Sequence, residues 1–281
     1  MEQDRPSGTA QGAAMVRALH RIVDDQPWLI DDPISARLLG DDFIRYRNLI
    51  RYFPFAASIR ANFLMRNRYA EDCLAESLAN GVRQYVLLGA GLDTFAYRQP
   101  AWAAALRIFE VDYPASQNWK HERLAAANIS IPGNVTLVPM NLERVSLQEG
   151  LAAAGMDFGV PSYFSSLGVT QYLTVEAFDL TLKFVTSLPP GSAIVFSFVL
   201  ASSDLAISER IAAGTLAAIS AARGEPWLSR YSPAVLANSL KTMGFSKVDY
   251  FSTDAANRRY FLGRRDGLRA SRVEQMMRAV V

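Results

Sequence analysis

Two glycines and a later pair of acidic residues form the sharpest chemical feature of the sequence. Gly89 and Gly91 directly follow an apolar run that ends at Leu88, and Glu110 and Asp112 lie about 20 residues further on. Glycine has no Cβ, so its backbone can turn sharply and approach a ligand closely. A carboxylate at this spacing can accept hydrogen bonds from both hydroxyls of a ribose. The pattern therefore predicts a nucleoside-binding loop.

The residues after the second glycine indicate which nucleoside suits this loop. A dinucleotide site has a third glycine where this chain has Thr94, and the preceding Asp93 would repel a pyrophosphate. S-adenosylmethionine carries a ribose, a sulfonium and an ammonium group, and no phosphate. The charges therefore favour S-adenosylmethionine as the cofactor, and an NAD-dependent oxidoreductase remains the alternative.

Several further motifs, spread over most of the chain in a fixed order, resemble those of one known family. They are residues 31–33, 81–94 with 96–98, 109–114, 167–170 with 172–174, and 259–261 with Arg264 and 266–268. Together they resemble the leucine carboxyl methyltransferase-like family of S-adenosylmethionine-dependent methyltransferases, in its bacterial branch. The resemblance implies a class I fold with a seven-stranded sheet. The resemblance also implies O-methylation, because many bacterial relatives in this family are O-methyltransferases of unassigned or natural-product substrates.

The resemblance also implies roles for individual residues. Gly89 and Gly91 would line the cofactor and Asp112 would hold its ribose, while Glu110, which belongs to the same strand, remains the alternative for the ribose. The segment 7–9, including Thr9, is similar to the family's amino-terminal lid over the methionine end of the cofactor. A helix cap at a frayed terminus explains that segment equally well.

Two positions depart from the family pattern. Asn141 and Leu142 stand where many relatives have an aspartate–leucine pair near the adenine. The side-chain oxygen of Asn141 can still accept a hydrogen bond from the adenine amino group. Leu167 stands where many relatives have a glutamate, so the role of that glutamate does not carry over to this chain.

An arginine interrupts the apolar face of the helix expected before the first strand. Residues at helical spacing on this face are Ile59, Phe63, Arg66, Ala70, Cys73 and Ser77. A buried guanidinium is costly without an anionic partner. Arg66 therefore either binds the carboxylate of the cofactor's methionine part, as the resemblance implies, or pairs with a structural acid. Arg68 and Asp72 are predicted to form an exposed i,i+4 ion pair instead.

Four residues are candidates for the acceptor side of the site. His20 is the candidate general base, needed only for a hydroxyl acceptor, because a carboxylate is already ionised and nucleophilic. Arg17 in the same segment would steer an anionic substrate. Tyr172 follows the fourth expected strand, near the methyl group, and Trp227 would help to enclose the acceptor.

The elements that must position these residues alternate between short apolar runs and helical patterns. Strands are expected at residues 84–88, 107–111, 135–139, 163–167, 193–199, 245–251 and 259–263, with helices at about 114–127, 146–154, 174–187 and 233–243 between them. This alternation predicts an α/β doubly wound sheet, with the last two strands as an antiparallel edge pair.

The remaining segments are expected to be helical additions to a single domain. Residues 1–80 would form an amino-terminal cap, broken at Pro27, Pro33 and Pro54 and ending in a long helix stopped at Asn80-Gly81. Residues 81–200 would bind the cofactor, residues 201–231 would form a helical insertion over the acceptor site, and residues 232–281 would supply the last strands and a tail.

The composition excludes several classes of protein. The 281 residues are 50% hydrophobic, with 29 basic and 27 acidic side chains and a net charge of +2, which argues against a nucleic-acid binder. One cysteine and two histidines predict neither a disulfide framework nor a metal site. The most apolar stretch, residues 193–201, is too short to cross a bilayer, and residues 1–6 do not resemble a secretory signal. We expect a cytoplasmic protein without a membrane partner, and a homodimer is compatible with the sequence.

The sequence as a whole predicts transfer of the methyl group of S-adenosylmethionine to an oxygen of a small-molecule acceptor, either a carboxylate or a phenolic hydroxyl. The departures at Asn141 and Leu167 keep open a second alternative, a degenerate cofactor-binding protein that acts as a regulator or a scaffold.

Overall fold

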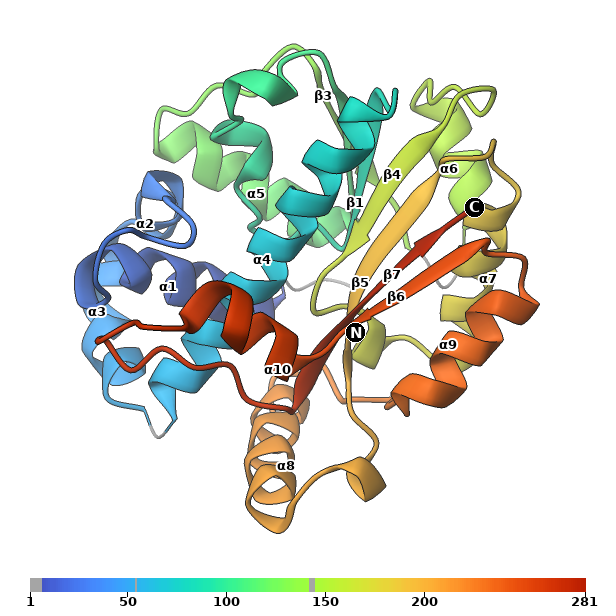
Figure 1. Cartoon of the computed structure of the whole chain (residues 1–281). Helices are drawn as coiled ribbons and strands as arrows, with labels where there is room; N and C mark the ends of the chain where they lie inside the picture. Colours follow the sequence, from blue (N-terminus) through green and yellow to red (C-terminus); the bar gives the residue numbers. More distant parts are fainter. Residues whose placement is uncertain (1–6, 54, 142–144) are drawn as a thin grey trace.

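One seven-stranded sheet organises the molecule (Figure 1). The computed structural model describes residues 7–53, 55–141 and 145–281. The strands are β1 (Gln84–Leu88), β2 (Arg107–Asp112), β3 (Val135–Pro139), β4 (Ser162–Ser166), β5 (Ala193–Val199), β6 (Lys247–Phe251) and β7 (Glu274–Val280). Their order in the sheet is β3-β2-β1-β4-β5-β7-β6. Strands β1 to β5 are parallel, and β7 is antiparallel to both of its neighbours, β5 and β6. The predicted α/β fold with an antiparallel edge pair is confirmed.

The seventh strand lies elsewhere in the sequence than predicted. Residues 259–263 were expected to form it, but Asn257–Phe261 is a turn of π-helix, and the strand is Glu274–Val280. Phe261 packs into the core from this helical turn, whereas Leu262 is 82% exposed. A short apolar run does not by itself distinguish a strand from a buried piece of helix. The true strand carries a pair of methionines, Met276 and Met277, which are fully buried on the two faces of the sheet.

Helices pack on both faces of the sheet and beside its carboxyl edge (Figure 1). They are α1 (Gly8–Val23), α2 (Pro33–Leu39), α3 (Asp41–Arg51), α4 (Ala56–Ala79), α5 (Pro114–Ala126), α6 (Leu147–Ala153), α7 (Val175–Thr186), α8 (Ile207–Ala221), α9 (Pro233–Thr242) and α10 (Thr253–Ala256). As predicted, α4 ends at Asn80-Gly81, where Gly81 has a φ of +96°. No helix in the described ranges combines the length and the apolar character needed to cross a membrane.

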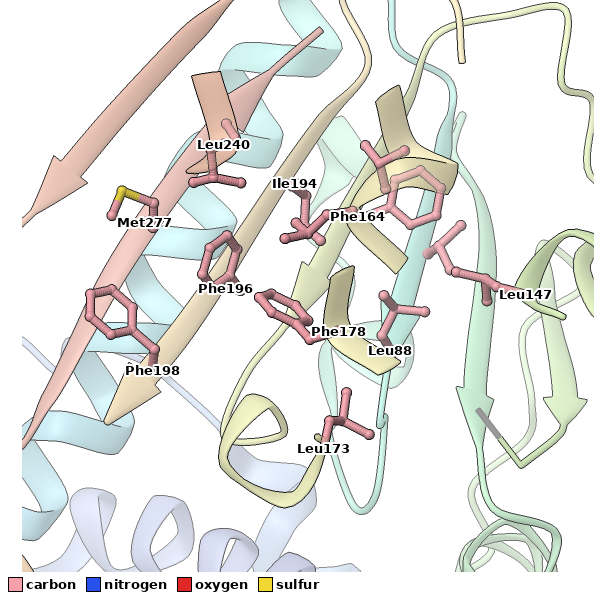
Figure 2. Packing of buried hydrophobic residues seen from close by; sticks show 14 of the residues in the cluster. Leu88, Leu147, Phe164, Leu173, Phe178, Ile194, Phe196, Phe198, Leu240 and Met277 are labelled. Carbon is pink, nitrogen blue, oxygen red and sulfur yellow. The ribbon is translucent and has the colours of Figure 1, made fainter. Parts of the chain in front are cut away.

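The alternation of side chains along the central strands divides the core into two layers. Helices α6, α7 and α9 cover one face with residues such as Leu147, Phe178 and Leu240, and these pack on strand residues including Phe196 (Figure 2). Helix α4 and the α10 segment cover the other face. Because all five residues of β1 are buried, the loop that follows this strand starts from a rigid support.

Candidate cofactor and acceptor site

A cavity of about 280 Å³ lies at the carboxyl ends of β1, β2 and β4. β1 is the point at which the strand order reverses, because β2 lies on one side of it and β4 on the other. Open α/β sheets bind ligands at such a switch point. The end of β1 and the following loop, residues 87–93, form the floor of the cavity, and helices α1 and α4, with Glu225, Pro226 and Leu228 after α8, complete its walls.

The glycine loop and Asp112 are joined by hydrogen bonds at the centre of the cavity. The Gly91 N–H donates a short hydrogen bond to Asp112 Oδ2, and the Tyr113 N–H donates to Asp112 Oδ1 at 2.6 Å. Burial raises the pKa of the Asp112 carboxyl, and these two N–H groups act in the opposite direction. Two backbone donors therefore hold the Asp112 carboxylate in a fixed orientation beside the loop.

Packing of the protein itself explains why both loop positions are glycines. Gly89 and Gly91 have φ angles of +69° and +46°. A Cβ on Gly91 would lie 2.9 Å from Ala10 Cβ in helix α1, and one on Gly89 would overlap the side chain of Val169. The sequence attributes these glycines to close approach of a ligand. In the structure, α1 and the segment after β4 also lie close against the loop.

Glu110, the alternative to Asp112 for the ribose, lies inside the protein and does not line the cavity. Lys120 Nζ is 2.8 Å from Glu110 Oε2, and the Tyr97 hydroxyl donates to the same oxygen at 2.8 Å. The side chains of Glu110 and Lys120 are each 1% exposed. Burial raises the pKa of Glu110, while Lys120 and Tyr97 act to lower it. Glu110 thus takes part in an internal ion pair.

Arg66 lines the cavity and also has an acidic partner within the protein. Its Nη1 donates to Glu274 Oε1 at 2.9 Å, and its guanidinium lies 3.9 Å from the ring centroid of Phe63. Its Nε has no hydrogen-bond partner among the described residues. A Cβ on Gly168 would lie 2.5 Å from Arg66 Nη1, so the glycine after β4 leaves room for the guanidinium. Arg66 thus has features of both of its predicted roles.

Three more predicted cofactor residues lie at the cavity. Asp93 accepts hydrogen bonds from Asn67 Nδ2 at 3.1 Å and from the Phe95 N–H at 2.8 Å. Asn141 and Thr9 also line the cavity, and Thr9 belongs to the first turn of α1. Leu142 lies outside the described residues.

The structure places His20 away from the cavity, in a buried polar cluster. Its Nε2 accepts the Leu29 N–H at 2.9 Å, so its Nδ1, 2.9 Å from Asp24 Oδ2, carries the proton. Arg60 contacts the same Asp24 carboxylate through two hydrogen bonds. Both ring nitrogens of His20 are therefore occupied, and its side chain is fully buried. This environment does not support a role as a general base.

Arg17 lines the cavity, but its guanidinium is held mainly within the protein. It donates to Asp32 Oδ2 at 3.2 Å and to the Leu92 carbonyl at 2.6 Å. Although burial acts to raise it, the pKa of Asp32 is held below its usual value by Arg17 and Arg98. Arg17 therefore stabilises the glycine loop through its hydrogen bond to the Leu92 carbonyl, a role that sequence reasoning missed.

The two aromatic candidates for the acceptor side have different positions. Tyr172 lines the cavity, and its hydroxyl is 3.3 Å from Ser220 Oγ in helix α8. Trp227 packs against the apolar core and does not line the cavity, whereas its neighbours Pro226 and Leu228 do. The insertion thus contributes to the wall of the cavity through residues beside Trp227, and its place over an acceptor stays a prediction.

Sequence reasoning missed Glu225 and Gln171, which also line the cavity. Glu225 Oε2 accepts the Thr9 N–H at 3.1 Å, and the Gln171 carbonyl accepts the Leu228 N–H at 2.6 Å. These contacts join segments far apart in the chain. No local pattern in the sequence marks them.

The strand order and the cavity at the switch point define the fold of class I S-adenosylmethionine-dependent methyltransferases. Comparison with solved structures agrees with this class. A candidate methyltransferase from Thermobifida fusca YX superimposes with a TM-score of 0.58 and 14% identity, covering 99% of this chain and 96% of that one. A DUF574 family protein from Streptomyces avermitilis gives 0.55 and 18%, with 94% and 96% covered.

Comparison of sequences identifies the family within this class. The profile of the family described as leucine carboxyl methyltransferase matches residues 10–186. YktD of Bacillus subtilis, named as a candidate S-adenosyl-L-methionine-dependent methyltransferase, is 31% identical, over 100% of this chain and 99% of its own length. A Mycolicibacterium paratuberculosis protein with the same description is 36% identical over 75% of this chain and 72% of its own. The chain belongs to the leucine carboxyl methyltransferase family of S-adenosylmethionine-dependent methyltransferases.

Proposed function

We propose that this protein transfers the methyl group of S-adenosylmethionine to an oxygen atom of a small-molecule acceptor, and that the acceptor oxygen belongs to a carboxylate. The observation that carries the proposal is the fixed Asp112 carboxylate beside the Gly91 N–H, at the switch point of a methyltransferase sheet.

The charges around the cavity fit a cationic nucleoside better than a dinucleotide. Asp93, Asp112 and Glu225 line the cavity, while Arg17 and Arg66, the arginines among its described lining residues, each pair with an internal acid. These three acids form no ion pair with a described lysine or arginine, and unpaired acids repel a pyrophosphate, so NAD is disfavoured. They attract a ligand with sulfonium and ammonium groups.

In the proposed arrangement, Asp112 accepts hydrogen bonds from the ribose hydroxyls. Arg66 binds the methionine carboxylate through the part of its guanidinium that Glu274 does not occupy, and Asn141 accepts from the adenine amino group. Gly89 and Gly91 let the loop turn beneath the ligand. Bound S-adenosylmethionine supplies an electrophilic methyl group on its sulfonium.

The acceptor is proposed to be a carboxylate because the cavity contains no histidine. Neither His20 nor His121 lines it, although both lie in described ranges. A carboxylate is nucleophilic at neutral pH without a base. The task of the protein is then to align the acceptor oxygen and to exclude water. Helix α1, with Glu225, Pro226 and Leu228, forms walls suited to this task.

Transfer of labelled methyl groups to matched sets of carboxylic acids and phenols tests the activity and the acceptor class. We expect methyl esters as products from the carboxylic acids. The Asp112→Ala variant should weaken S-adenosylmethionine binding by about 100-fold, because charge-assisted hydrogen bonds contribute about 1.5–3 kcal/mol each. Unchanged affinity in this variant, measured calorimetrically, would contradict the ribose assignment.

The same assay separates an enzyme from a degenerate cofactor-binding protein. Binding of S-adenosylmethionine without any methylated product from either acceptor set would favour the binding protein. Methyl transfer to phenols alone would retain the enzyme and overturn the carboxylate assignment. The cytoplasmic location and a homodimer remain predictions from the sequence.

A further inference from the structure

Glu225 is a buried carboxylate at the cavity, and no described residue supplies a cationic partner for it. The residue is 5% exposed and lines the cavity. Its one side-chain hydrogen bond among the described residues is from the Thr9 N–H to Oε2, at 3.1 Å. Neither a lysine nor an arginine of the described chain forms an ion pair with it. A buried charge is costly unless a partner compensates it, so the environment of Glu225 is incomplete without a cation.

Two sets of contacts hold Glu225 in the wall of the cavity. On one side it contacts the first turn of α1, whose Ala10 lies against Gly91 beside Asp112. On the other side, Ser220 Oγ lies 2.6 Å from the Glu225 carbonyl and 3.3 Å from the Tyr172 hydroxyl, after β4. Glu225 therefore lies between the end of β2, where Asp112 is proposed to hold the ribose, and the end of β4. In the proposed arrangement, the ribose lies at Asp112 and the methionine part lies near Arg66. The sulfonium is the cation that joins these two parts of the cofactor.

We propose that Glu225 is the residue that distinguishes the charged cofactor from its product, by stabilising the sulfonium of S-adenosylmethionine. This inference rests on the proposed function. S-adenosylmethionine has a net charge of +1 near neutral pH, whereas S-adenosylhomocysteine, which lacks the sulfonium, has none. A carboxylate in a cavity of low dielectric constant interacts strongly with that extra charge. After methyl transfer the interaction disappears, which favours release of the product.

The test compares calorimetric binding of three ligands to the wild type and to Glu225→Gln. Glutamine retains an oxygen that can accept the Thr9 N–H, so the substitution removes the charge and preserves the contact with α1. The ligands are S-adenosylmethionine, S-adenosylhomocysteine and sinefungin, an unreactive analogue with an ammonium group near the sulfonium position. Glu176→Gln, an exposed acid on α7, serves as the matched control.

We expect Glu225→Gln to weaken binding of S-adenosylmethionine and sinefungin by about tenfold or more, and binding of S-adenosylhomocysteine by less than about threefold. Glu176→Gln should change none of the three. Equal weakening of all three ligands by Glu225→Gln would overturn the proposal, because Glu225 would then serve a group common to them. Unchanged binding of all three would also overturn it.

Failure of the proposed function gives a different result. In that case the wild type itself binds neither S-adenosylmethionine nor S-adenosylhomocysteine, and Glu225 has no cofactor to select. Thermal unfolding of each variant without ligand shows whether the substitution has altered the fold.

Discussion

Replacing Lys120 by methionine tests the assignment of Glu110 to an internal ion pair. Lys120 lies in α5, and its Nζ is 2.8 Å from Glu110 Oε2 with both side chains 1% exposed. Methionine preserves most of the volume of the lysine stem and removes its charge. Among the described residues, the buried Glu110 carboxylate then keeps the Tyr97 hydroxyl as its one donor.

The burial of both side chains sets the expected loss of stability. Breaking a buried pair by removing one partner costs about 3–5 kcal/mol, because it leaves an uncompensated charge. We expect Lys120→Met to lower the free energy of unfolding by this amount. The double variant Glu110→Gln/Lys120→Met should recover at least half of the loss, since its pair is neutral and glutamine can still accept from Tyr97.

The loss should also depend on pH. Burial raises the pKa of Glu110 in the folded protein, so the native state binds its proton more firmly than the unfolded chain does. The contribution of this group to stability is therefore largest below the unfolded pKa and falls as the pH rises through the folded pKa. Removing Lys120 takes away an influence that lowers this pKa. The cost of Lys120→Met should therefore be larger at pH 8 than at pH 5.

Urea unfolding at both pH values measures these energies, and calorimetry measures cofactor affinity. The double variant should bind S-adenosylmethionine within about threefold of the wild type, because Glu110 does not line the cavity. A single-variant loss below about 1 kcal/mol, with no recovery in the double variant, would refute the ion-pair reasoning. Loss of cofactor affinity comparable to that of Asp112→Ala would restore Glu110 as a ribose ligand.

Two further substitutions test the loop and the arginine. Gly91→Val places a β-branched residue at a φ of +46°, with its Cβ 2.9 Å from Ala10 Cβ. We therefore expect urea unfolding to show a free energy of unfolding lower by at least about 1–2 kcal/mol. Unchanged stability would show that α1 can move away at little cost. Arg66→Met should weaken S-adenosylmethionine binding and destabilise the fold by leaving Glu274 buried and unpaired, whereas Arg66→Met/Glu274→Gln should recover stability but not affinity. Recovery of both would make Arg66 purely structural.

The parts of the fold that were predicted correctly depend on local sequence patterns. The buried run of β1, the glycines after it and the stop of α4 at Asn80-Gly81 are each set by neighbouring residues. Strand β7 was missed because its place between β5 and β6 depends on contacts with segments distant in the chain. The apolar run at 259–263 fits the local pattern of a strand equally well, although Asn257–Phe261 forms a turn of π-helix.

The same distinction applies to the site. Asp93 and Asn141 lie close to strand ends, so their place at the cavity follows from the strand assignments. Glu225 lies in an insertion, and its contact with Thr9 spans 216 positions in the sequence. The residue type of His20 suggests a general base, but in the structure its partners Asp24 and Leu29 occupy both ring nitrogens. These contacts are between side chains and backbone groups that no local pattern marks.

Register along the sheet explains why two acids at nearly the same distance from the glycine loop have different environments. Glu110 and Asp112 are two residues apart in β2 and so point to the same face of the strand. Glu110 lies opposite Leu87 of β1, within the sheet, where α5 can cover it with Lys120. The pairing of β1 with β2 ends one residue before Asp112, so this carboxylate extends past β1 to the Gly91 N–H. Spacing in the sequence identified both acids as candidates, and the position at which β1 ends separates the internal acid from the one at the cavity.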